Sequence, residues 1–139
     1  MKTVRYELSQ TQQVAADILP DLKKQDSKVV TLTGDLGVGK TTLMKAIMEQ
    51  LGYQGVVLSP TFTYVNVYEC ANGLTVFHFD LYRLNSQVQF EQLGFLEYLE
   101  QPNSLVFIEW PEVIVPILPK NSMHLALTML DDCARQLVY

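Results

Sequence analysis

Hydrophobic and polar positions alternate at the start of the chain and then change to helical spacing. Residues Thr3 to Leu8 alternate as a strand does. The next apolar positions recur on one face of a helix, at Val14, Ile18 and Leu22. Ser9 followed by Gln12 is typical of a capping box, so we expect this helix to open at Ser9. The chain is therefore predicted to begin with a strand and a helix.

A second strand and helix follow, joined by a glycine-rich loop. Lys28 to Thr33 is a β-branched run of strand length that ends at Gly34. Residues Thr41 to Leu51 repeat their apolar positions with helical spacing, and Gly52 ends them. We expect a strand, a loop and a helix in direct succession.

The middle of the chain returns to strand alternation, from Val56 to Leu81. The pair Asn72-Gly73 separates the segments Tyr64–Cys70 and Leu74–Leu81, which predicts an antiparallel hairpin. Ser86 to Glu100 then shows helical spacing, with Gly94 as a bend or packing position.

The last third of the chain is again rich in strand signals. Leu105 to Ile108 is an apolar run typical of a buried strand, and it stops at Glu109. Met123–Met129 and Arg135–Tyr139 predict a closing hairpin. We therefore predict an α/β fold of the P-loop NTPase kind, with a mixed parallel and antiparallel sheet flanked by helices.

Composition narrows the class of protein further. The chain has 139 residues, of which 48% are hydrophobic and 18% are charged. This balance excludes intrinsic disorder, and the length suits one domain spanning residues 1–139. No stretch approaches the ~20 apolar residues of a membrane span, and the N-terminus lacks a signal core. We expect a cytoplasmic protein that makes no membrane contact.

The charge balance bears on nucleic-acid binding. Ten Lys and Arg residues against fifteen Asp and Glu residues give a net charge of −5. The few basic residues form no stripe that could neutralise a phosphate backbone. We therefore expect no strong direct binding of nucleic acid, so that any RNA or DNA is held by a partner.

The glycine-rich loop carries the clearest chemistry. Residues Gly34 to Thr41 fit the pattern G-x-x-x-x-G-K-[ST], between a predicted strand and a predicted helix. Gly37 and Gly39 let the backbone turn its N–H groups towards phosphate oxygens, and the positive end of the helix adds attraction. Lys40 would reach the β- and γ-phosphates, and Thr41 would offer its hydroxyl to Mg²⁺. The loop predicts binding of a nucleoside triphosphate.

A bound magnesium nucleotide also needs an acid close to the metal. Glu109 directly follows a predicted buried strand and is the best placed, although a solvated acid at a strand end is the competing interpretation. Asp80 shares a strand face with His78 and could position the attacking water or hold a metal-bound water, or all of that face could be solvated. For His78 we favour a structural role. For Trp110 and for the Ser59–Thr63 loop, structural and functional interpretations stay open.

Four segments together resemble the TsaE family, also called YjeE, over nearly the whole chain. They are Gly34–Thr41, the Ser-Pro-Thr-Phe-Thr run Ser59–Thr63, the His-Phe-Asp-Leu-Tyr-Arg run His78–Arg83, and Ile108–Trp110. The resemblance implies an ATPase of low intrinsic turnover that docks on the proteins TsaB and TsaD. It implies a role in transferring a threonylcarbamoyl group to adenosine 37 of tRNA.

The resemblance also implies roles for matching residues. Thr41 and Glu109 look like the magnesium ligands, and Lys40, Asp80 and Glu109 look like the catalytic residues. The residues implied to bind ATP are Thr11, Gly37, Val38, Gly39, Lys40, Thr41, Thr42, Asp80 and Arg135. Within that set, Thr11 and Arg135 resemble positions that flank the nucleotide base.

Two other functions share the phosphate loop. A small metabolite or nucleotide kinase would need a basic lid, but the arginines of this chain are Arg5, Arg83 and Arg135 alone. The scarcity disfavours a kinase and predicts slow hydrolysis in isolation, because arginine stabilises the charge of the transition state. A nucleotide-gated binding module without relevant hydrolysis shares every motif and stays open.

Overall fold

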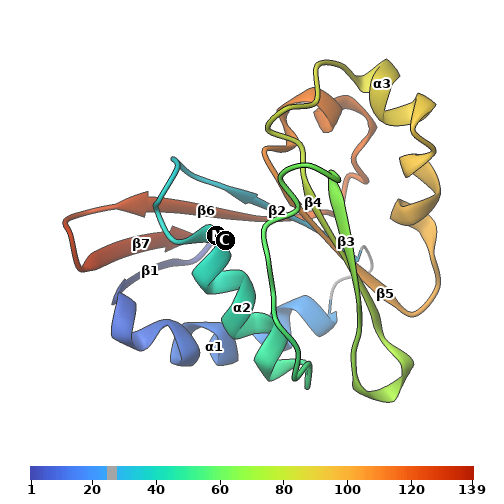
Figure 1. Ribbon diagram of the computed structural model, residues 1–139. Coiled ribbons are helices and arrows are strands. Elements are labelled where there is room, and N and C mark those ends of the chain that lie inside the picture. Colours follow the sequence, from blue (N-terminus) through green and yellow to red (C-terminus); the bar gives the residue numbers. More distant parts are fainter. Residues whose placement is uncertain (25–27) are drawn as a thin grey trace.

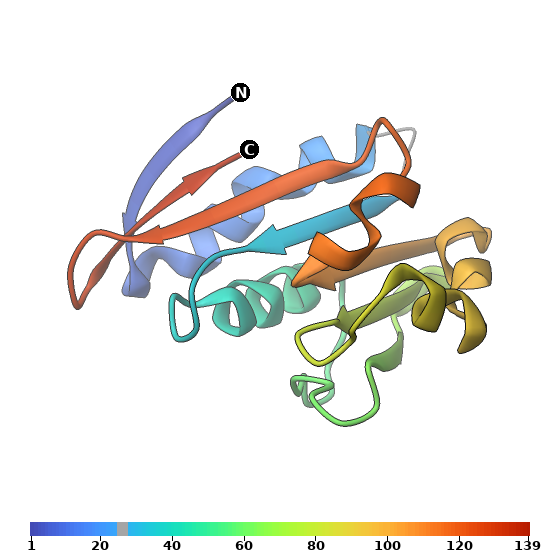
Figure 2. The same ribbon diagram turned by 90° about the horizontal axis from the view of Figure 1, so that it is seen from above.

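A mixed sheet lies at the centre of the protein (Figure 1). The computed structural model describes residues 1–24 and 28–139, and within them seven strands pair in the order β1-β7-β6-β2-β5-β4-β3. The strands are β1 Thr3–Glu7, β2 Val29–Thr33, β3 Val65–Glu69, β4 Thr75–Asp80, β5 Ser104–Glu109, β6 Met123–Met129 and β7 Ala134–Val138. The pairs β2–β5, β2–β6 and β4–β5 are parallel, and the other pairs are antiparallel. Figure 2 shows β6, β2 and β5 running in the same direction.

Helices cover both faces of this sheet, which confirms the predicted α/β class. The two long helices, α1 Thr11–Lys24 and α2 Lys40–Gln50, pack against each other on one face. The other face carries the short helix α3 Gln87–Gln92 and the 3₁₀ helices η3 Phe95–Glu100 and η4 Pro111–Ile117. None of the helices in the described residues is long and apolar enough to cross a membrane.

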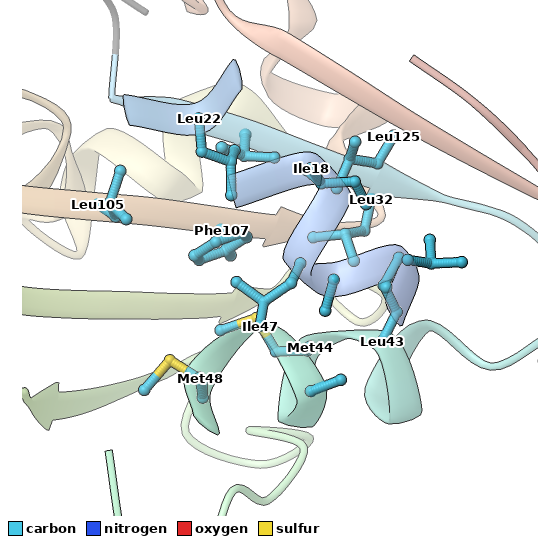
Figure 3. Packing of buried hydrophobic residues seen from close by; sticks show 14 of the residues in the cluster. Ile18, Leu22, Leu32, Leu43, Met44, Ile47, Met48, Leu105, Phe107 and Leu125 are labelled. Carbon is cyan, nitrogen blue, oxygen red and sulfur yellow. The ribbon is translucent and has the colours of Figure 1, made fainter. Parts of the chain in front are cut away.

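Alternation along β5 divides the core between the two faces. Leu105 and Phe107 pack with side chains of α1 and α2, as Figure 3 shows, whereas Val106 and Ile108 pack with the short helices. All six residues of this strand are buried. A strand with both faces covered reads as a continuous apolar run, which explains the pattern in the sequence.

The first helix confirms the predicted apolar face, because Val14, Ile18 and Leu22 are all buried. The predicted capping box at Ser9 is wrong. The box lies two residues earlier, where the Glu7 backbone N–H donates to Gln10 Oε1 at 2.8 Å, and Leu8–Gln10 form the 3₁₀ turn η1. The chain turns there because the pairing of β1 with β7 ends at Glu7.

Both predicted hairpins are confirmed, as β3–β4 and β6–β7. The 3₁₀ turn η2, Ala71–Gly73, joins the first pair, with Asn72 and Gly73 both at positive φ. The expected start of strand structure at Val56 is wrong, since β3 begins at Val65. The segment before β3 is bound by side chains instead, because the Leu58 carbonyl accepts hydrogen bonds from Tyr68 Oη and Asn66 Nδ2.

The segment predicted as one helix from Ser86 to Glu100 is divided in two. Ser86 caps α3 by accepting a hydrogen bond from the Gln89 N–H at 3.1 Å. Gly94 takes φ 78° and separates α3 from η3, so the bend is confirmed and the single helix is wrong. The bend lets Phe90 and Phe95 pack together, with ring centroids 5.4 Å apart.

Candidate nucleotide-binding site

The carboxyl ends of three parallel strands meet at one edge of the sheet. Leu32 of β2 and Asp80 of β4 both pair in register with Glu109 of β5. The loop 34–39 leaves β2 at this edge and enters α2. A cavity of about 240 Å³ opens here, and its lining residues are Leu36, Gly37, Gly39, Lys40, Thr41, Thr42, Ser59, Asp80, Glu109 and Trp110.

The loop itself is wound through left-handed backbone conformations. Gly37 takes φ 77° and Gly39 takes φ 110°, values that other residues adopt only with strain. Val38 between them is buried in the core, and its N–H donates to the Asp35 carbonyl at 3.1 Å. The anchored valine fixes the loop above the amino end of α2, where free N–H groups attract anions.

Lys40 is the first residue of α2, and its side chain contacts this loop. Its ammonium group donates to the carbonyl oxygens of Gly34 and Asp35, and it lies 4.4 Å from the ring centroid of Trp110. Burial lowers the pKa of Lys40, and the nearby carboxylates of Glu109 and Asp80 act to raise it. The ammonium group is therefore held in a site that has acidic neighbours.

The two acids differ in their surroundings. Glu109 is only 3% exposed, and its Oε2 lies 2.8 Å from His78 Nε2. Asp80 is half-buried; its Oδ2 accepts a hydrogen bond from Ser59 Oγ at 3.1 Å, and its Oδ1 accepts one from the Tyr82 N–H at 3.0 Å. The solvated interpretation is thus wrong for Glu109 and for His78, which is fully buried.

The donor groups suit one kind of metal. No cluster of three or more His, Cys, Asp or Glu side chains that could hold a metal occurs within residues 1–24 and 28–139. Mg²⁺ characteristically binds through one or two carboxylates together with substrate phosphates and water. Thr41 and Glu109 line the same cavity, and their hydroxyl and carboxylate groups match this ligand preference of Mg²⁺.

Three predicted residues do not line this cavity: Thr11, Val38 and Arg135. Arg135 is buried behind the loop, where its Nε donates to the Val38 carbonyl at 2.7 Å and its Nη1 donates to the Asp131 carbonyl at 2.8 Å. The Thr11 hydroxyl donates to the Leu8 carbonyl at 2.7 Å. Arg135 thus supports the phosphate loop, and the expectation that Thr11 and Arg135 flank a nucleotide base stays a prediction.

Two residues left open by the sequence do line the cavity, Ser59 and Trp110. Trp110 takes φ 56°, an unusual value for an aromatic residue, and its ring lies 4.9 Å from that of Tyr82. Strained residues of this kind are common at functional sites. One sequence signal pointed to Trp110, its position directly after Glu109.

Gly34→Ala is expected to destabilise the fold by about 2–4 kcal/mol, because strain and overpacking add. Gly34 has φ 147°, and an added Cβ would lie 2.7 Å from the Leu127 carbonyl oxygen and 2.8 Å from Val38 Cγ1. Gly37→Ala is the matched control, with a left-handed φ of 77° and nothing within 4 Å of the added Cβ. Urea denaturation measures both losses. Equal losses would contradict the steric account.

Comparison with known proteins gives one consistent family. The family model of the threonylcarbamoyl adenosine biosynthesis protein TsaE matches residues 6–137. The TsaE protein of Haemophilus influenzae is 40% identical over 117 residues, which cover 84% of this chain and 73% of that protein. The TsaE protein of Bacillus subtilis is 35% identical over 111 residues, which cover 80% of this chain and 68% of that protein. The crystal structure of Bacillus subtilis YdiB superposes with a TM-score of 0.72 at 28% identity, covering 98% of this chain and 83% of that one.

Proposed function

The chain belongs to the TsaE family, and on that premise we propose that it binds and slowly hydrolyses ATP with Mg²⁺ to support threonylcarbamoyladenosine formation in tRNA. The observation that carries the proposal is the shared cavity. The phosphate loop with Lys40 and Thr41 opens into it, and Asp80 and Glu109 reach it from neighbouring strands. This arrangement supports the proposal, because P-loop nucleotide hydrolases also place a lysine, a hydroxyl and an acid around the phosphates and the metal.

Each group has a distinct task in this proposal. The N–H groups of the loop and of the first turn of α2 hold the β-phosphate, and Lys40 leaves the loop carbonyls to bind the β- and γ-phosphates. Thr41 and Glu109 would hold Mg²⁺, which would neutralise charge on the transferring phosphoryl group. Asp80 lies at the strand end beside Glu109, where it orients the attacking water by accepting a hydrogen bond from it.

Lys40 is the one cation available to the transition state among the described residues that line the cavity. Arg135 is committed to loop carbonyls, and the Arg83 guanidinium lies 4.9 Å from the Phe62 ring centroid. No arginine is among the described residues that line the cavity. An arginine supplied by a partner is worth ~10³–10⁵ in rate for related hydrolases. We therefore propose that hydrolysis is slow in isolation and that TsaB and TsaD stimulate it.

ATP turnover of the chain alone, with TsaB and TsaD, and with bare tRNA tests the proposal. We expect slow turnover alone, a rise with the two proteins, and no response to tRNA, because the net charge is −5. Turnover indifferent to the two proteins would contradict the partner role. Phosphorylation of a metabolite in place of water would favour a kinase, and ATP binding without turnover in any mixture would favour a gated binding module.

Binding of ATP is expected to change the fluorescence of Trp110, the single tryptophan of the chain. The ammonium group of Lys40 lies over its ring at 4.4 Å, and it must move to reach the phosphates. A titration should give a saturable change with the affinity found by calorimetry. AMP, which lacks the β- and γ-phosphates, is the control and should leave the emission unchanged. An equal response to AMP would contradict the proposed movement of Lys40.

A further inference from the structure

A buried histidine contacts one of the two carboxylates of the candidate site. His78 on β4 is fully buried, and its Nε2 lies 2.8 Å from Oε2 of Glu109. His78 pairs in register with Phe107, two residues before Glu109, so the contact runs diagonally between parallel strands. His78 and Asp80 share one face of β4, because successive side chains alternate. His78 therefore lies directly beneath Asp80 and Glu109, the two acids that line the cavity.

The two ring nitrogens of His78 have different environments. The Glu109 carboxylate accepts, so Nε2 donates to it. Nδ1 is buried and has no hydrogen-bond partner among the described residues. An unpaired polar atom of this kind lowers stability. The contact of Nε2 compensates the buried Glu109 carboxylate, but the second nitrogen stays unsatisfied, so stability alone is a weak reason for histidine at this position.

The pair is also not needed to join its strands. β4 and β5 pair over six residues each, from Thr75↔Ser104 to Asp80↔Glu109. A buried polar contact with a carboxylate is a weak source of stability, because desolvation opposes the attraction. What the contact does determine is the orientation of the Glu109 carboxylate, one of whose oxygens is occupied by His78.

We propose that His78 is the positioning residue for the magnesium ligand Glu109. It holds Oε2, which leaves Oε1 as the oxygen that would bind the metal together with the Thr41 hydroxyl. His78 does not line the cavity, so it acts through Glu109 and touches neither nucleotide nor metal. The inference rests on the proposed function, in which Glu109 binds Mg²⁺. It extends that function to a residue whose pattern in the sequence favoured only a structural role.

Two polar substitutions at His78 separate positioning from packing. The amide nitrogen of glutamine can occupy the place of Nε2, whereas the shorter asparagine reaches only the place of Nδ1. His78→Gln keeps a donor for Glu109, and His78→Asn removes it. The matched control is His124→Gln, at the other histidine of the chain, which is exposed and contacts the Thr31 hydroxyl at 2.7 Å.

The measurement is ATP affinity by calorimetry, first in EDTA and then across a Mg²⁺ titration, with thermal unfolding followed in parallel. Loss of a group that orients a metal ligand typically costs about 10- to 100-fold in metal affinity. We expect His78→Asn to need that much more Mg²⁺ to reach the same ATP affinity, with metal-free binding unchanged. His78→Gln should recover most of the loss, and His124→Gln should behave as the unsubstituted chain.

A double-mutant cycle with Glu109→Gln completes the test. If His78 acts through the carboxylate, His78→Asn should have no further effect on the Mg²⁺ requirement once Glu109 is glutamine. If His78→Asn lowers thermal stability but leaves the Mg²⁺ requirement unchanged, the inference is overturned. It is also overturned if His78→Asn raises the Mg²⁺ requirement equally in the chain with Glu109 and in the chain with Glu109→Gln. If His78→Asn does not fold, His78→Leu takes its place in the same comparison.

The proposed function and this inference fail differently. If Mg²⁺ has no effect on ATP affinity in the unsubstituted chain, the magnesium-dependent function falls and the inference falls with it. If Mg²⁺ matters and Glu109→Gln removes its effect, while His78→Asn matches the unsubstituted chain, the function stands and only the role of His78 is overturned.

Discussion

Replacing Lys40 with alanine is expected to weaken ATP binding about 10- to 100-fold, both with and without Mg²⁺. The change removes a charge-assisted contact to the phosphates, worth ~1.5–3 kcal/mol. Lys40 is the one basic residue among the described residues that line the cavity, so no neighbour can replace it. Calorimetry with ATP in the presence of EDTA and of Mg²⁺ measures the loss.

The control for this substitution is Lys45→Ala. Lys45 is exposed on the same helix and does not line the cavity, so its removal changes the net charge equally without touching the site. The Lys45 variant should bind ATP as the unsubstituted chain does. Unchanged affinity in the Lys40 variant, with the fold intact by circular dichroism, would contradict the assignment of the phosphate loop.

Local signals in the sequence predicted most of the elements around the site. The phosphate loop is contiguous, so its residues and their spacing determine its geometry and its position between β2 and α2. Glu109 was found for a similar reason, because a buried strand such as β5 is a continuous apolar run whose end is visible. Parallel pairing then brings Asp80 beside Glu109.

Contacts between distant segments could not be predicted in this way. Arg135 binds the Val38 carbonyl across 97 positions of sequence, and His78 meets Glu109 across 31. Neither contact leaves a periodic pattern. The strand expected from Val56 failed for the same reason, since the segment is bound by Tyr68 and Asn66 from β3 and its own alternation did not decide its structure.

The charges of the cavity support the proposal that a metal takes part in its function. Asp80 and Glu109 both line it, and Lys40 is its one basic residue among those described. The same two carboxylates act to raise the pKa of Lys40, together with Asp35 and Glu112. A triphosphate entering such a site meets acids as well as the lysine. In the proposed function Mg²⁺ would convert that repulsion into attraction, because carboxylate and phosphate oxygens both bind it.

This arrangement predicts that the effect of replacing Glu109 depends on Mg²⁺, whereas the effect of replacing Lys40 does not. Glu109→Gln should lower Mg²⁺-dependent hydrolysis by about 10²–10³-fold, the loss typical of removing one group that stabilises charge in the transition state. Its metal-free ATP affinity should stay the same or rise, since a negative charge leaves the cavity. Thr41→Ala should share the loss of hydrolysis, because its hydroxyl acts through the same ion. Turnover rates and calorimetry in EDTA measure the two effects.

Glutamine is the better substitution because it retains an acceptor for His78, whereas Glu109→Ala would leave that buried histidine unpaired and destabilise the fold. The control is Glu112→Gln, which removes an exposed acid that does not line the cavity. It should hydrolyse ATP at the rate of the unsubstituted chain. If Glu109→Gln did so too, the metal would be held by another acid. Asp80 would then be the first candidate, because it is the other carboxylate that lines this cavity.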